Sequence, residues 1–161
     1  MPPALCLRIP GMKHWLVKTE PHVYSIDDLK RDKKTAWTGV RNYQARNFLQ
    51  QMAPGDQVLV YHSNAEPPGV VGIAKVAAVA KPDLTQFDKK SEFFDPKASL
   101  HQPRWFCPDI SFVKRLTAMV SLDDLRQNTA LEGLLLLQKG SRLSVIPVTE
   151  RHFRAIVGMG Q

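Results

Sequence analysis

Cysteine is scarce in this sequence of 161 residues, which contains two cysteines, Cys6 and Cys107, far apart in the chain. Two distant cysteines do not make the framework of a disulfide-stabilised secreted domain, and they fit a reducing compartment. We therefore predict a cytoplasmic location. Long apolar runs are also lacking, because no stretch approaches the length that spans a bilayer. Residues 1–11 have no apolar core behind a charged front, so a cleaved signal peptide is not expected.

The usual signatures of metal, phosphate-loop and nucleophile chemistry are missing as well. The five histidines show no ligand spacing and no paired cysteines accompany them, so we predict no metal site and no cofactor. A deaminase signature, a glycine-rich phosphate loop and a Gly-x-Ser-x-Gly nucleophile elbow are all absent. His62 and Ser63 are adjacent, and adjacent side chains on a strand point to opposite faces, which disfavours a catalytic pair. The sequence therefore favours a binding domain without catalytic residues over an enzyme.

Basic residues are in excess, because 22 lysines and arginines stand against 15 aspartates and glutamates, a formal net charge of +7. Such an excess makes nucleic acid a candidate partner, since lysine and arginine neutralise its phosphates. The basic residues are spread along the chain, so a solvated basic surface explains the charge equally well. The chain length predicts one domain. We place this domain at 12–161, after a flexible N-terminal tail at 1–11 that contains three prolines.

Apolar runs rich in β-branched and aromatic residues predict strands. We expect these strands at 14–19, 35–37, 57–62, 70–79, 105–116 and 142–148, with Gly72 as a candidate bulge. Short helices are expected at 26–31, at 42–52, just after Ser121, and from Thr149 to about 157, and a helical turn is expected at 131–137. Strands and helices do not alternate regularly along the chain. We therefore favour an α+β fold, a partly closed mixed β-barrel of five to six strands surrounded by short helices, over a doubly wound sheet.

The stretch 37–47, Trp-Thr-Gly-Val-Arg-Asn-Tyr-Gln-Ala-Arg-Asn, gathers aromatic, cationic and amide side chains at a predicted junction between a turn and a helix. In one hypothesis Trp37 stacks on a planar ligand while Asn42 reads its donor and acceptor edge. The side chains that can hold phosphate are Arg41 and Arg46. In the alternative, Trp37 and Tyr43 are core aromatics and Asn42 is a helix N-cap. The clustering favours binding, because core positions rarely gather so many polar groups.

Other segments supply candidate neighbours of this stretch. Lys18 ends the first predicted strand, where it can reach a pocket or point into solvent. The segment 81–104 is polar and lacks periodicity, and long loops of this kind are often functional. Its phenylalanines, which close an aromatic wall or anchor the loop, are Phe87, Phe93 and Phe94. Trp105 is either part of that wall or part of the core. Two more candidate neighbours are His62 and Ser63.

Four ordered motifs resemble the EVE domain family. They are Trp15-Leu-Val-Lys-Thr-Glu-Pro21, Trp37-x-Gly-Val-Arg-Asn-Tyr-x-Ala-Arg-Asn47, Tyr61-His-Ser63 with Pro68-Gly69, and Arg142-Leu-Ser-Val-x-Pro-Val148. The resemblance extends from about Lys13 to Ile156, which is nearly the whole chain apart from the tail. The number and order of the motifs make the resemblance specific.

The resemblance implies a PUA-like fold with a pocket related to that of the YTH domain, which encloses a methylated adenine in an aromatic cage. Members of the EVE family are thought to read modified bases in DNA or RNA, and the resemblance implies no catalytic activity. By this analogy Trp37 stands where the related pocket has a cage tryptophan, and Lys18 and Thr19 border it. The further tryptophans of that cage have no clean equivalents in this sequence.

These arguments together give a predicted ligand-binding set. Its members are Lys18, Thr19, Trp37, Gly39, Val40, Arg41, Asn42, Tyr43, Arg46, His62, Ser63, Phe87, Phe94 and Trp105. The predicted function is non-catalytic binding of DNA or RNA through a modified, for example methylated, base in an aromatic-walled pocket. The alternative is a sensor of a small molecule, nucleotide or anion, or an unrecognised enzyme, that uses the same pocket. No membrane contact is expected, and a monomer is compatible with the sequence.

Overall fold

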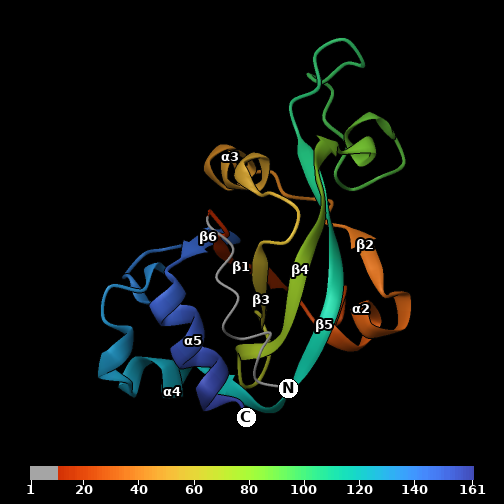
Figure 1. The fold of residues 1–161 in the computed structure, drawn as a ribbon. Coiled ribbons are helices and arrows are strands. Elements are labelled where there is room, and N and C mark those ends of the chain that lie inside the picture. Colours follow the sequence, from red (N-terminus) through yellow and green to blue (C-terminus); the bar gives the residue numbers. More distant parts are fainter. Residues whose placement is uncertain (1–10) are drawn as a thin grey trace.

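The computed structural model describes residues 11–161 and shows a mixed six-stranded sheet with short helices packed around it (Figure 1). The strands are β1 (His14–Thr19), β2 (Lys34–Ala36), β3 (Gln57–His62), β4 (Gly69–Pro82), β5 (Phe106–Ser121) and β6 (Val145–Val148). The helices are α2 (Ile26–Asp32), α3 (Tyr43–Gln51), α4 (Leu122–Gln127) and α5 (Glu150–Met159), with 3₁₀ turns η1 (Leu84–Phe87), η2 (Thr129–Leu131) and η3 (Leu135–Leu137). The α+β class is therefore confirmed.

The strand order across the sheet is β2-β5-β4-β3-β1-β6. β1 runs parallel to β3, and the other neighbouring pairs are antiparallel. A parallel pair needs a long crossover, which the chain provides by passing through α2, β2 and α3 between the two strands. β2 and β6 form opposite edges and do not pair with each other. The strands therefore form an open mixed sheet and do not close into the predicted barrel. Their number, six, lies within the predicted range.

The sheet carries an apolar core on each face. Trp15 and Val17 of β1 point into one core, where Leu49 of α3 also packs. Leu16, between them in sequence, points into the other core together with Ile156 of α5. Successive side chains on a strand alternate between faces, so a strand buried on both faces reads as a continuous apolar run. Figure 1 shows α4 and α5 together on one side of the sheet, away from α2.

The bounds of β2, β4, β5 and β6 differ from the predicted ones, most at the ends of β4 and β5 and at the start of β6. β5 continues to Ser121, beyond 116, because backbone pairing with β4 does not require the apolar side chains on which the prediction relied. β6 begins at Val145, so residues 142–144 are not in the strand. The bulge near Gly72 is confirmed: Val60 pairs with Gly72 and Tyr61 with Val70, which leaves the intervening residue of β4 without a partner. The helical turn predicted at 131–137 is present as η3, and η2 ends where the predicted turn begins, at Leu131.

β4 and β5 extend past the rest of the sheet and carry the segment between them at their tip (Figure 1). Of the predicted tail at 1–11, residues 1–10 lie outside the described residues. Across 11–161, no helix has both the length and the hydrophobicity to cross a membrane.

Candidate functional site

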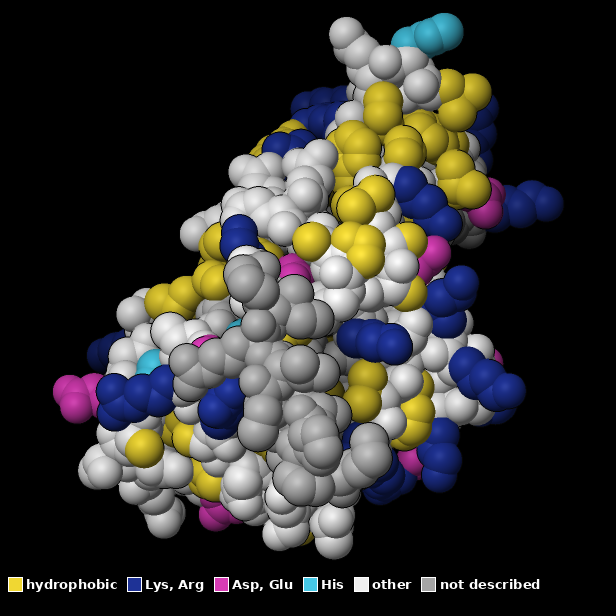
Figure 2. All heavy atoms as spheres, viewed as in Figure 1, with side chains coloured by type: hydrophobic (Ala, Val, Ile, Leu, Met, Phe, Trp, Pro, Cys, Tyr) yellow, Lys and Arg dark blue, Asp and Glu magenta, His cyan; other side chains and the backbone are white. Residues whose placement is uncertain are grey.

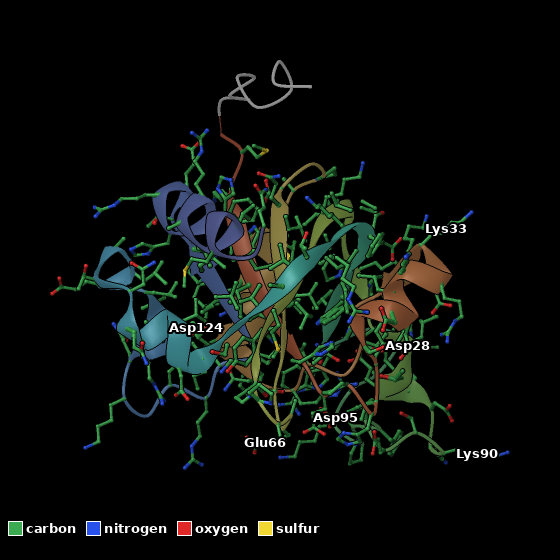
Figure 3. The ribbon with its side chains drawn as sticks, turned by 90° about the horizontal axis from the view of Figure 1, so that it is seen from below. Asp28, Lys33, Glu66, Lys90, Asp95 and Asp124 are labelled. Atoms are coloured by element: carbon green, nitrogen blue, oxygen red, sulfur yellow. The ribbon has the colours of Figure 1, made fainter. Side chains whose placement is uncertain are left out.

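A cleft of about 1300 Å³ opens beside the end of β1 and the loop between β2 and α3. We call it the Trp37 cleft. Segments far apart in the sequence line it, namely 18–24, 35–41, 63–64, 92–93 and 141–144. Small-molecule pockets commonly have volumes of about 300–1,000 Å³, so this cleft accommodates a larger ligand. Figure 3 shows Asp28 of α2 to the right of the sheet and Asp124 of α4 to its left.

Three aromatic side chains from separate segments line the Trp37 cleft. Trp37 is 7% exposed, and its backbone N–H donates to the carbonyl of Pro108 at 2.9 Å, which holds the end of β2 against β5. Tyr24 meets Trp37 edge to face, with ring centroids 6.3 Å apart and planes at 87°. Phe93 reaches the cleft from the long segment. Aromatic faces that surround an open space are suited to hold a flat ligand.

Tyr24 contributes a neutral hydroxyl to this wall. Burial and the hydrogen bond to Asp32 raise the pKa of Tyr24 to about 12. The hydroxyl donates to a carboxylate oxygen of Asp32 at 2.9 Å, and the hydroxyl of Thr19 donates to the backbone carbonyl of Tyr24 at 2.7 Å. These two contacts fix Tyr24 between the end of β1 and α2.

Gly39 lets the loop after β2 pass directly beneath Phe93. Its φ is +89°, a region that residues with a side chain rarely adopt. A Cβ atom placed on Gly39 would lie 2.9 Å from Cζ of Phe93, closer than carbon atoms approach each other. Both the backbone angle and the close ring therefore require glycine at this position.

Arg41 ties the loop after β2 to the long segment. Its Nε and Nη2 donate to the carbonyl of Phe93 at 3.1 and 2.9 Å. Nη1 donates to the carbonyl of Val40 at 2.9 Å and to Oδ2 of Asp83 at 3.1 Å. Nη2 also donates to Oγ1 of Thr85 at 2.9 Å. A guanidinium has five N–H donors, and these contacts engage all of them, so a phosphate reaches Arg41 only by displacing a protein oxygen.

Asp83 is the buried centre of this network, with no exposed surface. Besides Arg41, it accepts hydrogen bonds from the backbone N–H of Gly39 at 2.8 Å and from the N–H and hydroxyl of Thr85 at 2.9 and 2.5 Å. Burial alone raises the pKa of Asp83, but the hydrogen bonds from Thr85, Gly39 and Arg41 outweigh it and hold that pKa below its usual value. The carboxylate is therefore ionised and neutralises Arg41.

Four residues of the predicted set lie on or beside α3, outside the lining of the Trp37 cleft. Asn42 is the N-cap of α3, where its side-chain oxygen accepts from the N–H of Ala45 at 3.0 Å. Tyr43 stacks on Trp105, with ring centroids 5.0 Å apart. The guanidinium of Arg46 lies 4.8 Å from the Tyr43 ring. Tyr43, Arg46 and the buried Trp105 thus form a separate cluster beside α3.

The end of β1 and the turn after β3 contribute polar groups. Lys18 lines the cleft, and burial lowers the pKa of its ammonium group. Ser63 also lines the cleft, and its backbone N–H donates to the carbonyl of Thr19 at 3.0 Å. The Nε2 of His62 instead accepts from the N–H of Ile26 at 3.1 Å. Burial, and then the charge of Arg115, lower the pKa of His62, so the ring is neutral and supports α2.

The fold thus divides the predicted set in two. The members that line the Trp37 cleft are Lys18, Thr19, Trp37, Gly39, Val40, Arg41 and Ser63. The members that are not among its lining residues are Asn42, Tyr43, Arg46, His62, Phe87, Phe94 and Trp105. Among the phenylalanines of the long segment it is Phe93 that reaches the cleft.

Some lining residues are absent from the predicted set. Tyr24 gave no signal in the sequence, because it stands in an irregular segment before α2. Arg142 and Ser144 belong to the last of the four motifs, so that motif already pointed to them. The carbonyl of Ser144 accepts from the N–H of Lys18 at 2.8 Å, which brings this segment to the end of β1. In residues 11–161, no group of three or more histidine, cysteine, aspartate or glutamate side chains is placed to hold a metal ion.

The sequence comparisons identify the relatives of this chain. The model of the EVE domain family matches residues 13–159. Thymocyte nuclear protein 1 of Homo sapiens is 36% identical over 165 residues, and the match covers 91% of this chain and 73% of the human protein. Relatives in other vertebrates include the mouse protein, which is 38% identical over 165 residues with the same coverage.

Solved structures have the same fold. A protein of Pseudomonas syringae matches with a TM-score of 0.90 and 47% sequence identity, covering 92% of this chain and 99% of that one. The human THYN1 protein in complex with DNA that contains 5-methylcytosine matches with a TM-score of 0.86 and 35% identity, covering 92% and 98%. The family match extends over nearly all of the described residues. This chain belongs to the EVE domain family.

Proposed function

We propose that this chain is a non-catalytic nucleic-acid-binding domain that holds a modified base in the Trp37 cleft. The observation that carries the proposal is the convergence of Tyr24, Trp37 and Phe93 on one cleft. The human THYN1 protein, with the same fold, is seen in complex with DNA that contains 5-methylcytosine. A volume of about 1300 Å³ leaves room for a nucleotide with its sugar and phosphate.

Stacking alone does not account for binding. Taking a base out of a duplex costs a few kcal/mol, and stacking on an aromatic side chain returns about 1–3 kcal/mol. The base edge and the phosphates must therefore contribute as well. The N–H of Gly39 is engaged by Asp83, and the side chain of Asn42 caps α3. Polar side chains of the lining that can read the edge are Thr38, Ser63 and Ser144.

5-Methylcytosine is the first base to test, because it is present in the DNA bound by the human relative. Its extra group is a single methyl, and burying one such carbon is worth about 0.8 kcal/mol. A difference of about 1.4 kcal/mol is a tenfold change in affinity, so methyl burial between the aromatic walls gives a preference of about fourfold. A larger preference requires that the unmodified base leave a void or lose a contact.

The test is a comparison of matched oligonucleotides, with and without 5-methylcytosine, by fluorescence anisotropy. Trp37→Leu removes the aromatic face while keeping an apolar side chain at a position that is 7% exposed. We expect the affinity for the modified oligonucleotide to fall about tenfold or more, since stacking on one ring is worth about 1–3 kcal/mol. The preference for the modified base should disappear.

Tyr43→Leu is the matched control, because Tyr43 is 48% exposed and lies outside the cleft lining. This variant should keep the preference for the modified base. If Trp37→Leu, folded as judged by circular dichroism, binds both oligonucleotides like the wild type, the stacking role of Trp37 is wrong.

The second candidate, a sensor of a free nucleotide or another small anion, uses the same cleft and differs in its salt dependence. A polynucleotide binder loses affinity steeply as salt rises, because each neutralised phosphate releases counterions. A binder of a free nucleotide has a shallow slope. The same salt titration, done with DNA and with RNA, compares the two polymers. The cytoplasmic location and the monomeric state expected from the sequence stay predictions.

A further inference from the structure

A second pocket, of about 390 Å³, adjoins the Trp37 cleft, and the two share Lys18 and Ser141. We call it the cationic pocket. Its positive side chains come from three parts of the fold: Lys18 from β1, Arg126 from α4, and Lys139 from the turn after η3. Arg126 and Lys139 are exposed residues at its rim. Three separate parts of the fold therefore bring three cations to one pocket.

The two pockets differ in charge. Glu20 and Glu92 line the Trp37 cleft, whereas no carboxylate side chain is among the lining residues of the cationic pocket. The ion pairs that the described residues form engage other cations, namely His22, Arg31, Arg41, Lys81, Arg104, Arg115 and Arg154. The charge of the cationic pocket is thus not neutralised by neighbouring side chains. An anion is the ligand that fits it.

Tyr61 forms the floor of the cationic pocket and is 4% exposed. Burial raises the pKa of its hydroxyl, and the charge of Arg126 acts in the opposite direction. The hydroxyl is therefore protonated at neutral pH and able to donate a hydrogen bond. The ammonium group of Lys18 lies 6.0 Å from the centroid of the Tyr61 ring. The pocket thus combines a neutral donor with three cations, a combination suited to phosphate oxygens.

A general excess of positive charge does not by itself bring three cations to one pocket. On the face seen in Figure 2, lysine and arginine side chains are scattered among other side chains and form no continuous patch. The cationic pocket is instead a local concentration of charge directly beside the Trp37 cleft.

We propose that the cationic pocket holds a backbone phosphate of the nucleic acid whose modified base enters the Trp37 cleft. The inference rests on the proposed function and specifies how the polymer is held. A nucleotide carries its phosphate one sugar away from the base, so a phosphate site must adjoin the base site. Arg41, whose guanidinium lies 5.5 Å from the ring centroid of Phe93, has its five donors engaged by the protein. The cations left for a phosphate are Arg142 of the cleft lining and the three of the adjoining pocket, and only Lys18, Arg126 and Lys139 converge on one site.

The double variant Arg126→Gln/Lys139→Gln removes two charges of the pocket and leaves the Trp37 cleft intact. Binding is measured with single-stranded oligonucleotides, with and without 5-methylcytosine, at several salt concentrations. We expect about a tenfold loss of affinity at low salt for both oligonucleotides. The slope of log affinity against log salt should become shallower by about 0.7, the value for one phosphate of a single strand. The ratio of affinities for the two oligonucleotides should stay within about twofold of the wild-type ratio.

The matched control is Lys30→Gln/Arg151→Gln, which removes the same charges from exposed residues of α2 and α5 that line neither pocket. Equal losses of affinity in the two double variants overturn the phosphate site. A second arm uses inorganic phosphate alone in a thermal shift assay. If phosphate stabilises the wild type but the pocket variant binds oligonucleotides like the control, the pocket is a site for free phosphate, and the backbone assignment is wrong.

The two proposals fail in different ways. A wild-type protein that binds both oligonucleotides equally refutes the modified-base reader. Even then, the difference between the two double variants in the slope of log affinity against log salt decides whether the cationic pocket holds a phosphate.

Discussion

Asp83→Asn tests whether the buried carboxylate holds the walls of the Trp37 cleft in place. The substitution keeps the size of the side chain but removes its charge. Asp83 has no exposed surface and accepts hydrogen bonds from Gly39, Arg41 and Thr85. An amide offers one acceptor oxygen where the carboxylate offers two, so some of these donors lose their partner.

The expected cost follows from the burial of the pair. Removing one partner of a buried ion pair costs about 3–5 kcal/mol, because the other charge is left uncompensated. The side chain of Arg41 keeps 22% of its surface exposed, so we take the lower end, about 3 kcal/mol. In a domain of this size, 1 kcal/mol lowers the melting temperature by about 2–4 °C, which gives a decrease of about 6–12 °C.

The measurement is thermal unfolding followed by circular dichroism, together with the affinity for the 5-methylcytosine oligonucleotide. The control is Asp27→Asn, which breaks the exposed pair between Asp27 and Arg115. Exposed pairs contribute about 0–1 kcal/mol, so this variant should melt within about 4 °C of the wild type. If Asp83→Asn melts in the same range as the control, the network around Asp83 does not stabilise the cleft.

Acid titration provides an independent check on Asp83. Its pKa is held below the ordinary value of 3.8, so the folded state favours the ionised form. The stability that this ionised carboxylate contributes is present above about pH 4 and is lost as pH falls below it. The asparagine variant lacks this titration. The difference in unfolding free energy between wild type and variant should therefore shrink below about pH 4, and a difference that stays constant to pH 2 contradicts the argument.

Two further substitutions separate backbone geometry from ligand contact. Gly39→Ala should lower the unfolding free energy in urea by about 1–3 kcal/mol, because φ is +89° and the new Cβ meets Phe93. Adding Phe93→Leu should restore part of that loss, and an unchanged urea midpoint for Gly39→Ala alone would contradict the assignment. Asn42→Ala should cost about 0.5–2 kcal/mol through the lost N-cap of α3 while keeping the preference for the modified base. If Asn42→Ala loses the preference for the modified base while its unfolding free energy is unchanged, Asn42 contacts the base instead of stabilising α3.

Local patterns in the sequence were sufficient to predict most of the fold. Gln57 to His62 was predicted as a strand with the bounds that the structure has. The predicted helix N-caps are confirmed at Ser25, Ser121 and Thr149. At each of them a side-chain oxygen accepts a hydrogen bond from the backbone N–H three residues later, which has no partner within the helix. Such features depend on a few neighbouring residues. The family resemblance added a PUA-like barrel surrounded by helices, whereas the structure shows that the six strands form an open sheet.

The sequence by itself determined that residues 37–47 form an aromatic and cationic junction beside a glycine turn. Only the tertiary structure decided which of those side chains face the cleft. α3 begins at Tyr43, so Asn42 becomes its cap and Tyr43 and Arg46 turn toward Trp105. Most donors of Arg41 are engaged by residues more than forty positions away in the chain, and no local pattern contains these contacts.

The remaining walls also depend on contacts between distant segments. Phe93 rather than Phe87 or Phe94 reaches the cleft, because Arg41 holds the carbonyl of Phe93 while Gly39 leaves space for its ring. In the same way, β1, α4 and the turn after η3 bring Lys18, Arg126 and Lys139 to one pocket. The composition gives the number of cations but not their positions in space. Their proximity results from strand pairing and helix packing between segments more than a hundred residues apart.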